Sequence, residues 1–296
     1  MLIRTRGEKI FAVFNYVIMF VIGFLTLYPM WHILMSSISD PIYVFAYRGF
    51  YFFPRGNPHL RGYVLVFENP NIISGYFNTI WYVVIGTVMS MFSTILGAYA
   101  LSRKGLYWNG FIMKMIVFTM FFQGGLMPFY IQVSNMGLLD SRWAIVLPVM
   151  VSAMNLIILR TAFAGTPDSL IESAKLDGCN EWRIVWQIVV PVCKAAVSVI
   201  LLFYAVMYWN QWFNPSIFLN DRSLWPLQLV LREILIQGDM TGMVQLGGGI
   251  GQTGLEQYRM LVRYSTIVVA TVPILFIYPF IQKHFVAGVM IGSLKE

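Results

Sequence analysis

The chain has 296 residues, of which 58% are apolar, 16% aromatic and only 11% charged. About 25% of the residues in a soluble domain are charged, so this composition excludes an ordinary water-soluble enzyme and indicates a protein embedded in lipid. The formal net charge of +7 does not indicate a nucleic-acid partner, because the basic residues are scattered among predicted loops instead of clustering with aromatic residues.

Six stretches of the chain are candidates for membrane-spanning helices. A helix needs about 20 apolar residues to cross the hydrocarbon core of a bilayer, and these stretches contain no Asp, Glu, Lys or Arg and are long enough to cross it or nearly cross it. The sequence therefore predicts an all-α, polytopic protein in contact with lipid, with residues 1–296 forming one transmembrane domain. The predicted spans are 10–35, 76–101, 115–139, 143–159, 195–220 and 264–282.

The first span follows Arg4, Arg6 and Lys9, an arrangement also found in secretory signal peptides. Its uncharged run of 26 residues exceeds the about 7–15 apolar residues of a cleavable signal, so we expect an uncleaved helix. The next segment, 36–75, is rich in aromatic residues and contains four prolines. We expect it to form a compact loop on the outer surface.

The distribution of Lys and Arg predicts the orientation in the membrane. With a cytoplasmic N-terminus, the inner segments carry twelve Lys and Arg in 71 residues, and the outer segments carry eight in 86. We therefore expect both termini on the cytoplasmic side. The inner segments are 1–9, 102–114, 160–194 and 283–296, and the outer segments are 36–75, 140–142 and 221–263.

The cysteines and histidines do not form a recognisable site. Cys179 and Cys193 both fall on the expected cytoplasmic side, where thiols stay reduced, so we expect no structural disulfide. His32, His59 and His284 are dispersed along the chain, and we expect no metal site.

Three predicted helices contain residues that could interrupt them or line a pathway. The third contains Gln123-Gly124-Gly125, the fourth Pro148, and the fifth ends in an aromatic and amide cluster at 208–212. A break within a bilayer is tolerated only where protein or a water-filled cavity satisfies the freed backbone groups. The alternative is that these residues serve helix packing and interfacial anchoring. The candidate pathway residues are Gln123, Asn155, Tyr208, Trp209 and Asn210.

The segment 160–194 is patterned as two short helices. Thr166 is expected to cap the first helix, Pro167 fits its first position, and Gly178 fits just beyond its end. Asn180 can cap a second helix, in which Trp182, Val185, Trp186 and Val189 would share one face. We expect a helical elbow that projects into the cytoplasm. An amphipathic hairpin lying on the membrane surface is the simpler alternative.

The elbow resembles the EAA motif of ABC importer permeases, which reads approximately E-A-A-x-x-x-G, then nine residues, then I-x-L-P. The spacing fits, and the two departures, Ser173 for the second motif residue and Val190 for the leucine, are small. The residues that carry the resemblance are Glu172-Ser173-Ala174-Lys175-Leu176-Asp177-Gly178 and Ile188-Val189-Val190-Pro191.

Further segments resemble carbohydrate permeases of the MalG type, and among them the LplC-like branch associated with complex oligosaccharides. Together the similar segments cover the chain from about residue 76 to its end. They are 121–130 (Phe-Phe-Gln-Gly-Gly-Leu-Met-Pro-Phe-Tyr), 136–139 (Met-Gly-Leu-Leu), Asp177-Gly178, Trp209-Asn210 and the closing segment 282–295.

This resemblance implies an ABC type I importer permease fold with six transmembrane helices in a bacterial cytoplasmic membrane. It implies a permease subunit that performs no chemistry and moves an oligosaccharide or polysaccharide by ATP-driven alternating access. The implied partners are a second, similar permease chain, two copies of a cytoplasmic ABC ATPase and an external solute-binding protein. The chain itself is expected to hold no cofactor, with ATP and Mg bound by the ATPase. The resemblance assigns ATPase coupling to Glu172, Ala174, Asp177 and Gly178.

The glycine-rich part of the last outer loop, 240–256, is the candidate contact for the binding protein. In the family the corresponding loop can contact the sugar-loaded binding protein, so Gly247, Gly248 and Gly249 are the expected contact residues. A loop tip that contacts no partner is the alternative. The G-x-G-x-x-G string at 249–254 lacks the strand and helix of a nucleotide site. The closing segment is expected to reach toward the ATPases, with close approach at Gly288 and Gly292.

Two other functions stay open at the level of sequence. An ABC importer for a solute other than sugar would have the same elbow. A membrane-embedded enzyme would need a nucleophile with its base, or a metal cluster, at membrane depth, and the predicted spans have no charged residues to supply one.

The same lack of ionisable groups disfavours an ion-coupled carrier, and no G-x-x-x-x-G-K-[ST] motif is present. We therefore expect the energy to come from another subunit.

Overall fold

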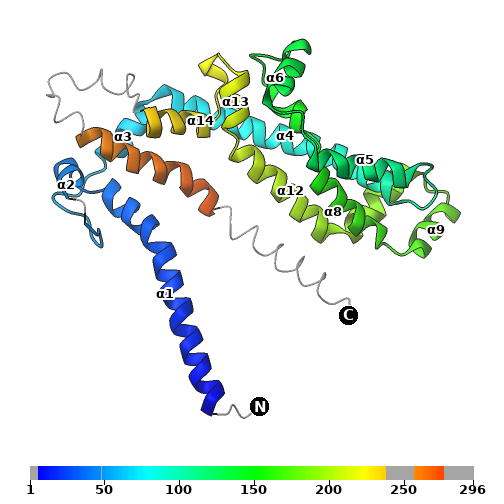
Figure 1. Ribbon diagram of the computed structural model, residues 1–296, viewed down its shortest axis with the longest axis horizontal. Coiled ribbons are helices and arrows are strands. Elements are labelled where there is room, and N and C mark those ends of the chain that lie inside the picture. The colour runs from blue at the N-terminus through cyan, green and yellow to red at the C-terminus, as the bar shows by residue number, and fades with distance from the viewer. Residues whose placement is uncertain (1–5, 48, 238–256, 277–296) are drawn as a thin grey trace. The chain divides into compact units, whose positions relative to one another are not determined.

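The computed structural model describes residues 6–47, 49–237 and 257–276, and these residues form helices and turns without a β-strand (Figure 1). The prediction of an all-α protein is thereby confirmed. Contacts divide the chain into two compact units: unit 1 comprises Met1–Pro70 and Glu233–Pro273, and unit 2 comprises Asn71–Arg232 and Ile274–Glu296. The prediction that the whole chain acts as one permease domain stays a prediction.

Unit 1 begins with α1, a helix of 32 residues that is about 48 Å long. None of its apolar 18-residue window is buried, as expected for a surface that faces lipid. Its helices are α1 (Arg6–Ser37), α2 (Pro41–Ala46), α3 (Arg61–Glu68), the π-helical turn η4 (Glu233–Gln237) and a helix over Gln257–Phe276, of which the residues to Pro273 belong to this unit.

The loop after α1 folds back on itself through capping and long-range hydrogen bonds. Asp40 caps α2 by accepting a bond from the Ile42 amide at 3.0 Å. Tyr63 of α3 shares a hydrogen bond of 2.6 Å with Ser37 at the end of α1. Gly62 lies so close to the helix over 257–276 that a Cβ there would overlap Ser265. Small and polar residues thus allow these helices to pack closely.

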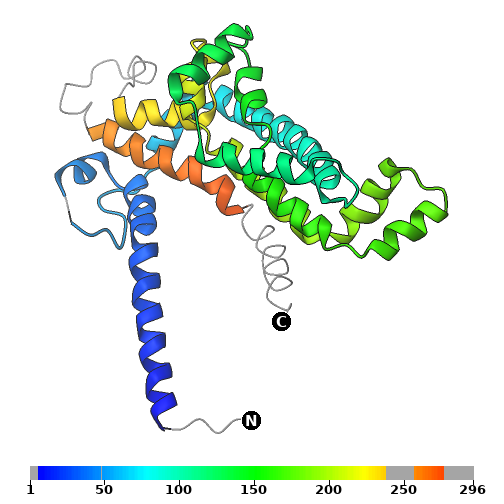
Figure 2. The ribbon, with the colours of Figure 1, turned by 45° about the vertical axis from the view of Figure 1, so that its right-hand side comes forward.

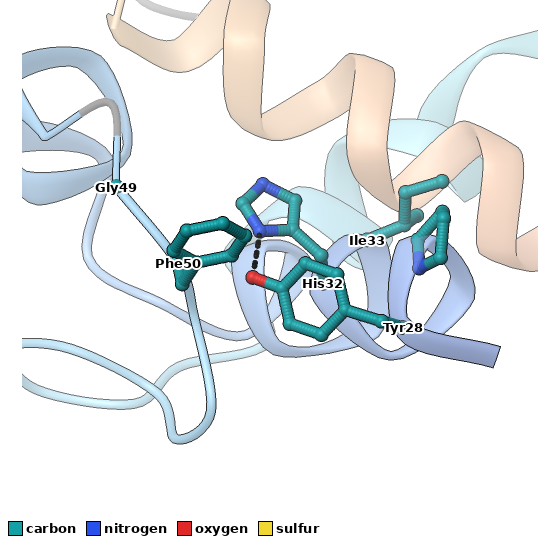
Figure 3. Close-up of a pocket in the computed structure, with 6 residues that line it drawn as sticks. Tyr28, His32, Ile33, Gly49 and Phe50 are labelled. Carbon is teal, nitrogen blue, oxygen red and sulfur yellow. Dashed lines mark hydrogen bonds between the residues drawn. The ribbon is translucent and has the colours of Figure 1, made fainter. Parts of the chain in front are cut away.

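A cavity of about 390 Å³ opens where the loop around Gly49 and Phe50 lies against α1 (Figure 3). The Tyr28 hydroxyl lies 3.3 Å from His32 Nδ1 and accepts a bond of 3.0 Å from the Tyr51 amide. Aromatic side chains therefore order this loop, which the sequence predicts to be compact.

Unit 2 is built around α4, a continuous helix of 33 residues beside which α8 and α12 run (Figures 1 and 2). Its helices are α4 (Pro70–Ser102, in this unit from Asn71), α5 (Asn109–Phe121), α6 (Leu126–Asn135), α7 (Trp143–Val146), α8 (Ala153–Ala164), α9 (Asp168–Leu176), α10 (Glu181–Arg183), α11 (Val190–Val192), α12 (Lys194–Trp209), α13 (Phe213–Phe218) and α14 (Leu227–Arg232), with 3₁₀ turns η1 (Leu147–Val149) and η3 (Arg222–Leu224) and the π-helical turn η2 (Ile184–Val189).

Three bent helix pairs account for the interrupted spans. The chain bends by 115° between α5 and α6, by 50° between 143–149 and α8, and by 90° between 181–192 and α12. Gly125 has φ +86° at the first of these breaks, a conformation that favours glycine. Three single helices in the described ranges are long and apolar enough to cross a membrane, and up to six spans result if each bent pair is one. The six predicted spans are compatible with this arrangement.

The fifth predicted span, 195–220, is wrong at its C-terminal end. The helix α12 stops at Trp209, and α13 begins at Phe213 after three non-helical residues. Asn210 follows the last helical residue, and its backbone and side-chain amides both donate to the Val206 carbonyl, at 3.1 and 2.9 Å. The uncharged stretch is therefore a helix followed by a separate short helix.

The interior of unit 2 contains tyrosines whose hydroxyls join three helical segments. Tyr204 and Tyr208, one turn apart on α12, are at most 1% exposed. The Tyr204 hydroxyl lies 2.7 Å from Thr94 Oγ1 and accepts a bond from the Ser152 amide at 3.0 Å. The Tyr208 hydroxyl lies 3.0 Å from Ser90 Oγ. Because these buried polar groups are satisfied, they hold α4, α12 and the break before α8 in one arrangement.

Candidate functional site

Residues 160–164 of the predicted segment belong to α8, and the elbow proper, residues 166–193, consists of α9 and a second helix, 181–192, joined by a tight turn. Gly178 has φ +78°, its amide donates to Lys175 O at 3.0 Å, and the Cys179 amide donates to Ala174 O at 2.9 Å. These two bonds form the Schellman motif that ends a helix at a glycine. Asn180 then accepts a bond of 2.9 Å from the Arg183 amide. The predicted roles of Gly178 and Asn180 in ending and starting helices are confirmed.

The predicted start of the elbow is wrong by one residue. The cap position of α9 is Pro167, with ψ 131°, and the first helical residue is Asp168. Thr166 does not cap the helix. Its side chain is buried, and its hydroxyl lies 3.5 Å from the Cys193 thiol. Proline disfavours helical backbone in the residue before it, so Thr166 stays outside α9. Its side chain lies against Cys193 at the far end of the elbow.

The first turn of α9 carries a charge pair. Lys104 Nζ lies 2.5 Å from Asp168 Oδ2, and both side chains are exposed. The Lys104 ammonium lowers the pKa of Asp168 below its ordinary value. The ionised carboxylate at this position also interacts favourably with the helix dipole.

The inner face of the elbow is apolar and buried. Ile171 and Ala174 of α9 pack with Val185 and Val189 of the second helix in the main core of unit 2. The predicted single face is only partly correct, because Trp182 is 55% exposed. The turn over Ile184–Val189 is π-helical, with i to i+5 hydrogen bonds. The buried residues of this turn are Ile184, Val185 and Val189, a spacing that departs from the 3.6-residue period.

The outer face of the elbow carries the remaining motif residues. Glu172, Asp177 and Gly178 are exposed, and no atom within 4 Å would meet a Cβ at Gly178. Leu176 between them is 89% exposed. Sequence reasoning missed Leu176, although an apolar residue beside acidic motif positions is a recognisable signal. An exposed leucine, followed two residues later by a glycine with free space around it, suits contact with another protein surface.

The five candidate pathway residues come from three separate places in unit 2, namely two helix breaks and the C-terminal end of α12. Gln123 is exposed between α5 and α6, and Asn155 is buried in the first turn of α8. Tyr208 is buried, Trp209 is partly buried and Asn210 is exposed at the end of α12. Tyr208 packs the helices together, whereas Gln123 and Asn210 are accessible.

Sequence reasoning missed two residues next to the end of α12. The Arg232 guanidinium lies 4.2 Å from the centre of the Trp212 ring, within the range of a cation–π interaction. Among the described residues, Trp209 Nε1 and Gln211 Oε1 are buried without a hydrogen-bond partner. Nothing in the spacing of Trp212 and Arg232 along the sequence predicts their contact.

Two groups of predicted contact residues cannot be placed. Gly247, Gly248 and Gly249 of the glycine-rich loop lie outside the described residues, as do Gly288 and Gly292 of the closing segment. Their roles stay predictions.

Comparison with known proteins relates the chain to transport systems. A family model for the "Binding-protein-dependent transport system inner membrane component" matches residues 72–291. The Bacillus subtilis polygalacturonan/rhamnogalacturonan transport system permease protein YtcP is 39% identical over 97% of this chain and 99% of its own length. Protein LplC of the same organism is 36% identical over 99% of this chain and 97% of its own length.

A solved structure is similar along nearly the whole chain. It is a chain from the crystal structure of a bacterial ABC transporter involved in the import of the acidic polysaccharide alginate. The TM-score is 0.86 and the identity 28%, over 96% of this chain and 100% of the other.

Proposed function

Because this chain belongs to the family of inner membrane components of binding-protein-dependent transport systems, we propose that it is the permease subunit of an ABC importer that carries an oligosaccharide into a bacterial cell. The chain is a transport subunit and not an enzyme. The observation that carries the proposal is the elbow, whose inner face is buried in unit 2 and whose outer face presents Leu176, Asp177 and Gly178.

The elbow is the proposed docking element for the ATPase. Gly178 leaves space for a close approach, the carboxylates of Glu172 and Asp177 can pair with basic groups of the partner, and Leu176 can enter an apolar pocket. Ala174 has a different role, since it is buried and packs α9 onto the second helix. A rigid element of this kind transmits a rigid-body movement between subunits.

The importer acts with other subunits, as the family requires of an inner membrane component that depends on a binding protein. We infer one second permease chain, two copies of the ATPase and an external solute-binding protein. ATP binding closes the ATPase pair and moves the elbows, and the permeases then face outward and accept the solute from the binding protein. The loaded binding protein stabilises the outward-facing state by its differential affinity for it.

The substrate class we infer is an acidic oligosaccharide. The Arg232 and Trp212 pair offers a cation for a carboxylate and an aromatic face for a sugar ring. Asn210 and Gln123 supply exposed amides in the same unit. The transport system of YtcP is named for polygalacturonan and rhamnogalacturonan, and the solved transporter is involved in the import of the acidic polysaccharide alginate, which supports the same class here.

Reconstitution in lipid vesicles tests this function. We expect this chain alone to hydrolyse no ATP and to accumulate no solute. With a second permease, the ATPase subunits and the binding protein, it should accumulate an oligogalacturonide in an ATP-dependent manner and a neutral maltooligosaccharide far less. The Arg232→Gln variant should lose most of this preference, because glutamine keeps hydrogen-bond donors but removes the charge that strengthens a bond to a carboxylate. Accumulation by the isolated chain under a proton or sodium gradient would contradict the proposal.

The orientation is tested by labelling in intact cells. With Cys179 and Cys193 replaced by serine, a cysteine at position 180 should resist a membrane-impermeant maleimide, because we infer that the elbow and both termini are cytoplasmic. A cysteine at position 220, which is exposed, should react. The reverse pattern would place the elbow away from the ATPases and so would contradict both the orientation and the docking role.

A further inference from the structure

The end of α4 next to the elbow is bonded to both helices of the elbow. The Tyr99 hydroxyl donates to the carboxylate of Glu181, the first residue of the second helix. Lys104, just beyond α4, pairs with Asp168, the first residue of α9. Lys175 Nζ lies 2.7 Å from the other oxygen of Glu181 and so closes the turn between the two helices. The elbow is therefore attached to α4 as one piece.

The same end of α4 is also bonded to α8, which leads into the elbow. Arg103 Nη2 donates to the Phe163 carbonyl at 3.1 Å, and Arg160 Nε donates to the Leu101 carbonyl at 3.1 Å. The Arg103 guanidinium lies 4.9 Å from the centre of the Tyr99 ring. Because Phe163 is fully buried, this junction is a packed one and does not slide freely.

The opposite end of α4 is bonded to the loop over 219–227. Three polar side chains near the start of the helix, at positions 78, 79 and 82, form hydrogen bonds with the backbone of this loop. Asn78 Nδ2 donates to the carbonyls of Ser223 at 2.6 Å and Trp225 at 3.1 Å, Tyr82 donates to the Leu224 carbonyl at 2.8 Å, and Thr79 Oγ1 accepts from the Leu227 amide at 2.8 Å.

Between these two junctions α4 is unbroken, and Asn78 and Tyr99 are separated by about 32 Å along its axis. The other candidate spans of unit 2 within the described ranges are bent pairs, with angles of 115°, 50° and 90°. We propose that α4 carries the movement of the elbow to the 219–227 loop, and that Tyr99 is the positioning residue that fixes α4 to the elbow through Glu181. Figures 1 and 2 show α4 running from α9 at one end to α13 and α14 at the other. This inference rests on the proposed docking of the elbow to an ATPase.

Among the contacts at the elbow, the Tyr99 bond is the one suited to transmit force. Tyr99 is 7% exposed, and a hydrogen bond to an ionised carboxylate is stronger than a neutral one. The two carboxylates are similarly exposed, Asp168 at 53% and Glu181 at 58%, so the contacts differ in their donors. The Lys104 side chain is 86% exposed, and an ion pair made by such a side chain contributes little. Loss of the tyrosine hydroxyl should therefore loosen the junction, whereas loss of the lysine charge should not.

The experiment compares Tyr99→Phe with the matched control Lys104→Gln in the reconstituted importer. Uptake and ATP hydrolysis are measured together, and the thermal midpoint of each complex is measured in detergent. We expect Tyr99→Phe to lower the ratio of solute moved to ATP hydrolysed by about tenfold, the effect of losing one bond to a charged group. Its thermal midpoint should stay close to that of Lys104→Gln, whose ratio should match the wild type.

The possible outcomes distinguish a failure of the role of α4 from a failure of the proposed importer function. If the wild-type complex takes up no solute with ATP, the proposed function fails and this inference fails with it. If the wild type transports and Tyr99→Phe has an unchanged ratio, the role of α4 is overturned while the function stands. If Tyr99→Phe does not assemble, Glu181→Gln decides by comparison with Lys175→Gln. Both variants remove the ion pair between Lys175 and Glu181, but only Glu181→Gln also removes the charge of the Tyr99 acceptor. A lower ratio in Glu181→Gln than in Lys175→Gln supports the inference, and equal ratios overturn it.

Discussion

Replacing Gly178 by leucine should abolish ATP-driven uptake, or reduce it at least about tenfold, while the protein still inserts into the membrane. Gly178 adopts φ +78°, where a residue with a Cβ costs about 1–2 kcal/mol, and 1.4 kcal/mol already corresponds to about tenfold in an equilibrium. Apart from its two chain neighbours, no atom of the described chain lies within 4 Å of a Cβ at this position, so the added side chain would project toward the docking partner. Uptake and binding of the ATPase are measured in the reconstituted complex.

A second substitution at the same position separates backbone strain from blocked docking. Asparagine tolerates the left-handed conformation better than other residues with a Cβ, and it is smaller than leucine. Gly178→Asn should therefore retain a substantial part of the uptake that Gly178→Leu loses. Gly137→Leu serves as a matched control for strain, because Gly137 also has a positive φ, +68°, and open space around it. Wild-type uptake by Gly178→Leu would contradict the docking role of the elbow.

The turn of the elbow could be predicted from sequence because its determinants are local. A glycine after a helical run and an asparagine two residues later end one helix and start the next by hydrogen bonds within a few residues. The structure shows both, at Gly178 and Asn180. The break at Gln123-Gly124-Gly125 was predictable for the same reason. The family also could be recognised, since its motif is a short string at fixed spacing.

The partners of the elbow could not be predicted, because they depend on tertiary contacts. Glu181 lies 82 positions after Tyr99, to which it is hydrogen bonded, and no pattern in either segment indicates the other. The π-helical turn over Ile184–Val189 likewise departs from the 3.6-residue period that predicted a single apolar face. Residue type alone predicts a cap at Thr166, but the buried threonine lies against Cys193 instead.

The packing of α4 against α12 gives the second large expected effect. A Cβ at Gly86 would lie 2.6 Å from Cζ of the Tyr208 ring. Tyr208 is 1% exposed, and its hydroxyl is 3.0 Å from Ser90 Oγ, so the ring cannot move away without losing this contact. Overpacking a filled interior costs about 1–3 kcal/mol. We expect Gly86→Ala to lower the free energy of unfolding by this amount, seen as a lower thermal midpoint in detergent and a smaller yield of folded protein.

Gly110→Ala is the matched control, because no atom lies within 4 Å of a Cβ at Gly110 in α5. Alanine replaces glycine favourably within a helix by about 0.4–1 kcal/mol, so this variant should be as stable as the wild type or more so. Tyr208→Leu supplies the second half of a double-mutant cycle. If the ring is what obstructs the new methyl group, Tyr208→Leu should cost less stability in the Gly86→Ala background than in the wild type. Additive effects of the two substitutions would show that α4 and α12 do not meet at these residues.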